Sequence, residues 1–317
     1  MGSDHRRMWL EIAGRIPGIS ALNLLIIFNP NAGSGRAAKK LPLIQARFEQ
    51  LGIAATFKLT TRPGHGKTLV ATSALENFDG VIAAGGDGTV FEVLNGLYQH
   101  PKPVRAPLGL LPIGTGNAFA RDLELQPADW LAAIEILRRR HIRKVDTGLV
   151  NAADCEYYFL NIVGMGFSVD AGQTAKRLKP IGNTAYTLAT LWQVLKFKSY
   201  PLEIELDGTV IRQDNVFVTI SNTRYTGTHF LIAPGASIDD GLLDVTLLEK
   251  LPRHRLLSLF PTIYEGRHVE HAEVATYKAA RIVIHAPRAM LLGPDGEFRG
   301  TTPAEITCLQ QDLEIFT

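Results

Sequence analysis

The sequence has few cysteines, little net charge and no long apolar run. Cys155 and Cys308 are its only cysteines in 317 residues, which excludes a disulfide framework and a four-thiolate zinc site and favours a cytoplasmic setting. Lys plus Arg number 33 and Asp plus Glu 31, so the formal charge of +2 lacks the basic excess typical of nucleic-acid partners. Apolar runs such as 24–28 are far shorter than the ~20 residues of a membrane span, so we expect no transmembrane segment.

The chain is long enough for two domains, and the pattern of its apolar and polar residues changes near residue 145. Before that point, short apolar runs alternate with helical periods, which is typical of a parallel sheet with crossover helices. After it, extended segments dominate. The predicted strands are 23–28, 54–59, 80–84 and 107–111, then 157–163, 202–206, 216–221, 242–248 and 281–285. The predicted helices are 37–51, 128–140, 185–197 and 253–264. We expect an N-terminal extension at 1–22, an α/β domain at 23–145 and a mainly β domain at 146–317.

The densest motif is Gly85-Gly86-Asp87-Gly88-Thr89, which directly follows a predicted strand and precedes a helical pattern. Glycines at such a turn let backbone N–H groups approach a phosphate, and the helix N-terminus adds favourable partial charge. The structural alternative is a tight turn in which Asp87 caps the helix.

Two further boxes follow other predicted strands, at 29–36 and 112–117. In open α/β sheets ligands bind outside the carboxyl ends of the strands, so the three loops are expected to converge on one nucleotide. The segment 64–68 ends like a P-loop, but Thr61 stands where the leading glycine belongs, and a helix start is the better interpretation. The Gly-x-Gly-x-x-Gly dinucleotide fingerprint is absent from all three boxes, which disfavours nicotinamide chemistry.

Carboxylates in the second half are the candidates for chemistry and for metal binding. Asp239-Asp240-Gly241 and Pro294-Asp295-Gly296-Glu297 each combine acids with a glycine turn. Asp-Gly pairs are ordinary hairpin turns, and this alternative stays open. Phosphoryl transfer, however, needs a divalent cation and a carboxylate near the attacking hydroxyl.

Together, the three boxes and the Pro-Asp-Gly-Glu turn resemble the diacylglycerol kinase catalytic family, which includes soluble bacterial lipid kinases and sphingosine and ceramide kinases. The resemblance implies a phosphofructokinase-like α/β domain with a mostly parallel sheet, followed by a β-sandwich domain. It implies an ATP- and Mg²⁺-dependent lipid kinase that takes its substrate from a membrane surface, with peripheral contact at the inner membrane face.

The resemblance also assigns roles to residues. The implied catalytic residues are Glu297 as proton acceptor of the lipid hydroxyl, Asp295 as its supporting carboxylate, and Asp87 as the central acid of the nucleotide site. The implied ATP-binding residues are Asn29, Pro30, Asn31, Ala32, Gly33, Thr60, Gly85, Gly86, Asp87, Gly88, Thr89, Val90, Phe91, Glu92 and Thr115. The implied magnesium site consists of the Asp240 side chain with the carbonyls of Ser237 and Leu242, since oxygen-only coordination suits that ion.

Two features qualify this interpretation. Ala118 stands where many bacterial members have Asp, and the chain resembles the sphingosine-type members better at this position. The resemblance therefore implies diacylglycerol, a sphingoid base or a related lipid as the acceptor. The extension at 1–22 carries apolar residues at roughly helical spacing and could touch a membrane, or it could be a capping helix. The alternatives in function are a small-molecule kinase related to NAD kinases and a nucleotide- or lipid-binding protein without turnover.

Overall fold

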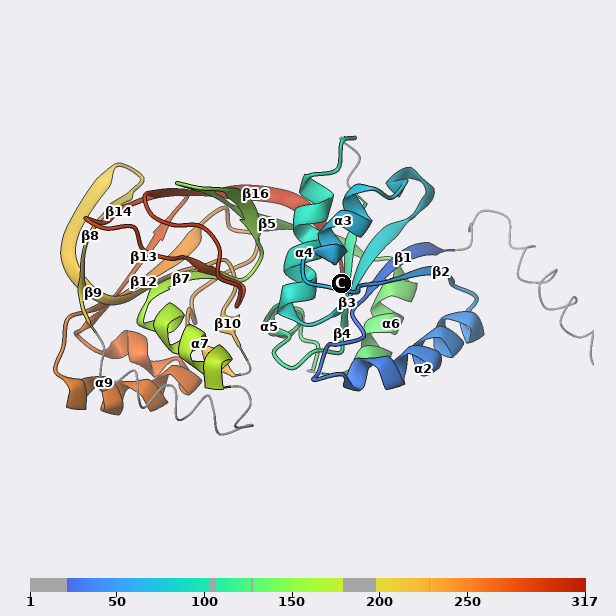
Figure 1. Cartoon of the computed structure of the whole chain (residues 1–317), viewed down its shortest axis with the longest axis horizontal. Helices are drawn as coiled ribbons and strands as arrows, with labels where there is room; N and C mark the ends of the chain where they lie inside the picture. Colours follow the sequence, from blue (N-terminus) through green and yellow to red (C-terminus); the bar gives the residue numbers. More distant parts are fainter. Residues whose placement is uncertain (1–21, 103–105, 127, 179–197, 228) are drawn as a thin grey trace, which may run out of the picture.

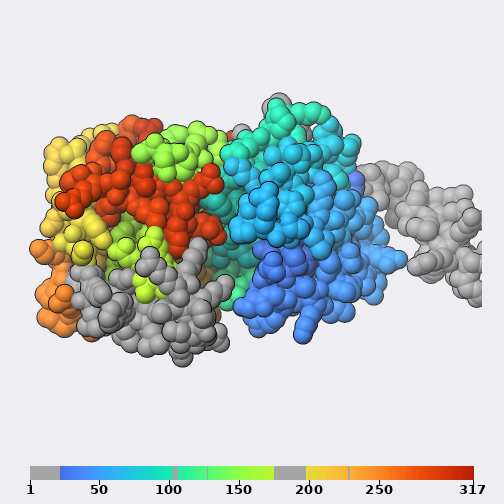
Figure 2. All heavy atoms as spheres, in the orientation of Figure 1, coloured from blue at the N-terminus to red at the C-terminus, as the bar shows by residue number. Residues whose placement is uncertain are grey.

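The computed structural model describes residues 22–102, 106–126, 128–178, 198–227 and 229–317. The helix predicted at 185–197, and all of the predicted extension except Leu22, lie outside these residues. The molecule has two parts that lie side by side and in contact (Figures 1 and 2). An α/β part with a parallel sheet precedes a mainly β, sandwich-like part, which confirms the predicted fold class.

The first part is a parallel sheet covered by helices on both sides. Its strands are β1 (Asn23–Phe28), β2 (Ala54–Leu59), β3 (Gly80–Gly85) and β4 (Leu108–Pro112), in the spatial order β4-β3-β1-β2. Its helices are α2 (Arg36–Gln50), α3 (His65–Ala71), α4 (Asp87–Tyr98), α5 (Ala118–Asp122) and α6 (Trp130–Arg139), with a 3₁₀ turn at Leu75–Asn77. Strands β1, β3 and β4 are almost wholly buried, as expected for a sheet with two covered faces.

The chain reverses its direction across the sheet at β1. From β1 it moves outward to β2, and from β2 it returns past β1 to β3 and then to β4. Helix α2 therefore lies on the same side as α6, to which an Arg47–Glu135 ion pair joins it, and α3 and α4 pack together on the other side (Figure 1). The loops after β1 and β3 meet at this switch point, which is the usual ligand position in such sheets.

The second part is built from antiparallel strands around its own core. Its elements are β5 (Ile142–Ala152), β6 (Glu156–Phe159), β7 (Ile162–Gly166), α7 (Phe167–Leu178), β8 (Tyr200–Leu206), β9 (Thr209–Ser221), β10 (Tyr225–Thr226), β11 (Phe230–Leu231), β12 (Leu243–Glu249), α9 (Arg253–Leu259), β13 (Val274–Ala279), β14 (Arg281–His285), β15 (Gly293–Pro294) and β16 (Ala304–Phe316), with 3₁₀ turns at Phe260–Glu265 and Arg267–Glu270. Strand β9 pairs with β8 through its first half and with β7 and β12 through its second half. Apolar side chains from these strands fill the core between them.

Strands β5 and β16 join the two parts. They pair with each other in antiparallel register, and Ile315 of β16 also pairs with Leu108 of β4. One end of each strand contributes to the second core, through Val150 and Ile306, and the other end to the first core. Because the same two strands belong to both cores, the two parts share one hydrogen-bonded framework.

Most predicted elements of the first part are present within one or two residues, and several segments elsewhere differ from the prediction. The strand predicted at 216–221 already begins at Thr209, as β9. The extended segment predicted at 157–163 is split into β6 and β7, because the backbone at Leu160 and Asn161 turns its N–H groups toward Asp295. The helix predicted over 253–264 ends at Leu259 and continues as a 3₁₀ turn. Strand β5 already begins at Ile142, before the domain boundary predicted near residue 145.

Candidate active site

The three glycine-containing loops converge at the carboxyl ends of β1, β3 and β4. A Cβ placed on Gly33 would lie 3.0 Å from the carbonyl oxygen of Ile113, and one on Gly86 would lie 3.3 Å from Gly114 Cα and 3.8 Å from the amide nitrogen of Thr115. A Cβ on Gly114 would overlap with Gly86 Cα. Backbone therefore touches backbone where the loops meet, and only glycine allows this approach.

Asp87 connects the second and third loops. It is the first residue of α4, and its Oδ1 accepts a hydrogen bond of 2.7 Å from the amide of Ala118, at the start of α5. A Cβ on Gly116 would overlap with its Oδ2. Burial raises the pKa of the Asp87 carboxyl, and the amide of Ala118 and the charge of Arg121 oppose that rise. Asp87 does not cap α4, because the N-cap of that helix is Gly86 and carries no side-chain hydrogen bond. Its carboxylate instead binds the first amide of the neighbouring short helix α5.

Among the other residues expected around ATP, some side chains connect the loops and others are buried in the protein interior. Asn29 donates from Nδ2 to Thr89 Oγ1 at 3.1 Å, and its Oδ1 accepts from the amide of Asn31, so these side chains tie the first loop to α4. Val90 and Phe91 point into the protein interior, and Phe91 packs against Tyr157 of the second core with ring centroids 5.9 Å apart. At these two positions only the backbone is left to face a nucleotide.

Glu92 and Thr60 support the loops from the side of α3. Glu92 accepts hydrogen bonds of 2.7 Å from the amides of both Gly64 and Gly66, so its carboxylate covers the N-terminus of α3. The buried Thr60 donates its amide to the carbonyl of Phe28. The segment 64–68 is a helix start, as the sequence predicts.

The Pro-Asp-Gly-Glu turn is a tight turn with a buried acid at its tip. Asp295 and Gly296 have φ of 45° and 82°, and the amide of Glu297 donates to the carbonyl of Pro294 at 2.7 Å. Asp-Gly is the pair that such a double left-handed turn prefers. The Asp-Gly pair therefore forms the tight turn that the sequence alternative described, and this turn also carries the residues of the functional interpretation.

Backbone amides at the gap between β6 and β7 bind the carboxylate of Asp295. Its two carboxylate oxygens accept three backbone hydrogen bonds of 3.0 to 3.2 Å, from Leu160, Asn161 and Ile162. Burial raises the pKa of Asp295 to about 7 against the effect of these donors, and the nearby charge of Asp87 adds to the rise. The two acids, predicted from opposite halves of the chain, therefore lie within electrostatic reach of each other.

The side chain of Glu297, from the turn of the second part, reaches the start of α4. Its Oε1 is 3.1 Å from the position of a Cβ on Gly88, the second residue of that helix. The side chain itself is exposed. The turn of the second part thus brings a carboxylate to the glycine box of the first part, which is the geometry that the proposed proton acceptor requires.

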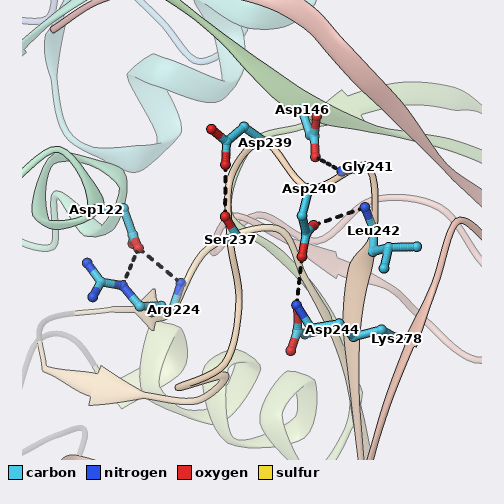
Figure 3. Close-up of polar contacts among 10 residues, drawn as sticks. All are labelled: Asp122, Asp146, Arg224, Ser237, Asp239, Asp240, Gly241, Leu242, Asp244 and Lys278. Carbon is cyan, nitrogen blue, oxygen red and sulfur yellow. Dashed lines mark hydrogen bonds and ion pairs between the residues drawn. The ribbon is translucent and has the colours of Figure 1, made fainter.

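The residues predicted to bind magnesium lie together, but their contacts point to a different cation. Asp240 Oδ2 accepts from Lys278 Nζ at 2.7 Å and its Oδ1 from the amide of Leu242 at 3.1 Å, while Ser237 donates its hydroxyl to Asp239 (Figure 3). Within the described residues, no group of three or more His, Cys, Asp or Glu side chains is arranged to hold a metal ion. The ammonium group of Lys278 already neutralises Asp240 at Oδ2, so a direct bond from this oxygen to Mg²⁺ would place two cations side by side. The metal site stays a prediction, and its test is given below.

Several polar residues next to the site were not singled out from the sequence. Asn117 is buried in the left-handed conformation at φ 54° and donates to the carbonyl of Gly114, with its Oδ1 unpaired. The side chain of Asp122 is 4% exposed and binds Arg224 of the second part at 2.9 Å (Figure 3). Asn117 is the last residue of the third box and Asp122 lies in the short helix that follows it, and these positions are the sequence signals for the two residues.

Comparisons with known proteins agree with this geometry. Residues 23–150 match the family model described as "Diacylglycerol kinase catalytic domain", and residues 161–317 match "YegS C-terminal NAD kinase beta sandwich-like domain". A diacylglycerol kinase of Staphylococcus saprophyticus is 32% identical over 92% of this chain and 94% of its own length. A diacylglycerol kinase of Bacillus subtilis is 31% identical with the same coverage.

A solved structure shares the fold. The crystal structure of a diacylglycerol kinase from Bacillus anthracis superposes with a TM-score of 0.71 at 24% identity, covering 94% of this chain and 97% of that one. The family models match the two parts in the order in which the fold presents them, and the curated relatives extend over nearly the whole chain. The chain belongs to the diacylglycerol kinase family and is a phosphotransferase that acts on an alcohol group.

Proposed function

We propose that this protein transfers the γ-phosphoryl group of ATP to a hydroxyl group of a lipid. The observation that carries the proposal is the position of Glu297, a carboxylate from the second part, against the N-terminus of α4 where the glycine loops of the first part converge. A phosphoryl donor cradled by backbone amides and an acid beside it are the two requirements of direct transfer to an alcohol. Membership in a lipid kinase family supports the same acceptor class.

Each carboxylate then has a distinct role. Glu297 accepts the proton of the attacking hydroxyl, so that the oxygen can form its bond to the γ-phosphorus as the bond to the β-phosphate oxygen breaks. Asp295 fixes the turn that carries Glu297, because its carboxylate binds three amides of the gap between β6 and β7. Asp87 keeps the second and third loops in register through the amide of Ala118.

The phosphates are expected at the amides of the three loops and at the N-terminus of α4. There the partial positive charge of the helix stabilises negative charge that develops during transfer. Magnesium that arrives with ATP would neutralise part of the phosphate charge. We derive no step through Asp240, since its oxygens already bind Lys278 and the amide of Leu242.

The acceptor is the least constrained part of the proposal. The small side chain of Ala118 is buried beside Asp87, and the proposed acceptor is diacylglycerol, a sphingoid base or a related lipid. In the described part of the chain, no helix is long and apolar enough to cross a membrane. We propose that the protein works in the cytoplasm and meets its substrate at the surface of the inner membrane.

The test is a phosphorylation assay with labelled ATP, Mg²⁺ and three acceptors in parallel: diacylglycerol, a sphingoid base and NAD. Label in a lipid supports the proposal. Label in NAD alone would favour the second candidate, a NAD kinase-like activity, which the description of the matched C-terminal domain makes worth including. Nucleotide-induced stabilisation without any labelled product would instead indicate a binding protein.

A variant pair tests the role of the acid. Glu297→Gln keeps the size of the side chain but cannot accept the proton, and it should lower kcat by roughly 10² to 10⁴ with little change in nucleotide affinity. Glu314→Gln, at an exposed position of β16, serves as the control and should keep full activity. Full activity in Glu297→Gln would remove Glu297 from the mechanism.

A further inference from the structure

Four carboxylates gather beside the loop that precedes β12, and we call them the Asp240 cluster. They are Asp146, Asp239, Asp240 and Asp244. Asp146 is fully buried and accepts from the amides of Gly241 and Gln311 at 2.6 and 2.7 Å. Asp239 forms an ion pair of 2.6 Å with Arg143. The remaining two acids share a single cation.

That cation is the ammonium group of Lys278. It lies 2.7 Å from Asp240 Oδ2 and 3.3 Å from Asp244 Oδ2. The side chain of Asp244 is only 14% exposed, and its Oδ2 has no hydrogen bond of good geometry, so the ammonium is its main compensation. Burial by itself lowers the pKa of Lys278, but the two carboxylates outweigh it and raise that pKa.

The backbone fixes this arrangement. Lys278 of β13 stands directly opposite Asp244 of β12 in the antiparallel register, so the two side chains emerge on the same face of the sheet. Asp240 reaches the same point from the preceding turn, where its Oδ1 accepts from the amide of Leu242. The register of β12 and β13 therefore places the ammonium group of Lys278 where a metal ion bound to oxygen atoms would neutralise Asp240 and Asp244.

We propose that Lys278 is the resident cation of the Asp240 cluster and takes the place of a divalent metal ion there. The loop 237–242 then folds without metal. The proposal stands independently of the proposed lipid kinase function, because it concerns the protein without nucleotide or lipid.

Equilibrium dialysis of nucleotide-free protein against MgCl₂, followed by elemental analysis, tests the proposal directly. The wild-type protein and Asp240→Asn should bind the same amount of Mg²⁺. Lys278→Met, which keeps an apolar stem of similar length, should bind about one additional ion per chain, and Asp240→Asn added to Lys278→Met should abolish that ion. One ion per wild-type chain that disappears in Asp240→Asn would overturn the proposal and establish the magnesium site instead.

Thermal unfolding provides a second measurement. EDTA should leave the Tm of the wild type unchanged. Lys278→Met should lower Tm by roughly 2 to 6 °C, because the largely covered carboxylate of Asp244 loses its partner, and MgCl₂ should reverse the loss where matched NaCl does not. An unchanged Tm in Lys278→Met, or a loss that Mg²⁺ does not reverse, would contradict the proposal.

Two further variants keep the test decisive if Lys278→Met does not fold and provide its control. If Lys278→Met does not fold, Asp244→Asn combined with Lys278→Met removes both charges of the cross-strand pair, and this double variant should fold without Mg²⁺. Failure of the double variant to fold would count against the proposal. Lys102→Met, which removes an exposed lysine paired with Glu76, is the matched control and should change neither Tm nor Mg²⁺ binding.

Discussion

The pH dependence of stability should carry the signature of Asp295. In the folded protein burial raises its pKa to about 7, whereas the unfolded chain has the ordinary value of 3.8. Between these two values the folded protein binds a proton that the unfolded chain has released. The contribution of Asp295 to the free energy of unfolding is therefore complete below about pH 3.8 and is lost as pH rises toward 7.

The size of the effect follows from the two pKa values. Each unit of pKa difference corresponds to about 1.4 kcal/mol, so a rise from 3.8 to about 7 corresponds to a loss of up to about 4 kcal/mol across this range. Asp295→Asn cannot titrate and lacks this loss. It retains one oxygen acceptor for the amides of the gap and places an N–H₂ group against another, at a cost of about 1 to 3 kcal/mol that does not depend on pH.

The measurement is urea unfolding of wild type and Asp295→Asn at several pH values from 5 to 8. The stability difference in favour of the wild type should shrink as pH rises, by about 1.4 kcal/mol per unit until pH 7, and then level off. Asp214→Asn, at an exposed position, is the matched control for the removal of a carboxylate. A difference that stays constant or grows with pH in Asp295→Asn would refute the assignment of a proton to this carboxyl group.

Two substitutions test the contacts between the parts and between the loops. Asn95→Ala removes hydrogen bonds of 2.8 and 3.0 Å to the backbone of Tyr158, which join α4 to β6, and should cost about 2 kcal/mol or more in thermal or urea unfolding; a loss below about 0.5 kcal/mol would contradict that role. Gly114→Ala places a Cβ on Gly86 Cα and should weaken ATP binding at least ~10-fold in calorimetry. Gly235→Ala, whose Cβ would meet Asp244 Oδ1 at 3.6 Å, should bind ATP normally.

Local patterns predict the first part of the fold well, because each of its elements has a local cause. Strands β1 and β2 span the residues predicted for them, and the glycine boxes stand at the turns that need them. A parallel sheet then brings the carboxyl ends of its strands to one edge, and the convergence of the three loops follows from that geometry.

The second part was less predictable, since its limits depend on distant partners. Leu160 and Asn161 interrupt an otherwise extended segment only because Asp295, more than 130 positions away, accepts their amides. The contact between Lys278 and Asp240 depends on the register of β12 and β13, which no local pattern encodes. The sequence identified these acids as candidates, but their partners emerged only from the fold.

The shared strands explain how acids from one part can serve a phosphate site in the other. A carboxylate on a separately moving domain would reach the attacking hydroxyl only after the domains close around the substrate. Here β5 and β16 contribute to both cores, and Asn95 of α4 binds the backbone of β6 at Tyr158, only two residues before the gap that holds Asp295. The chain of contacts runs from α4 through β6 to the turn of Asp295 and returns to α4 at Glu297. Because this loop of contacts is closed, the distance between the glycine box and the proton acceptor is set by packing rather than by a hinge, and a loss of Asn95 should therefore reduce kcat as well as stability.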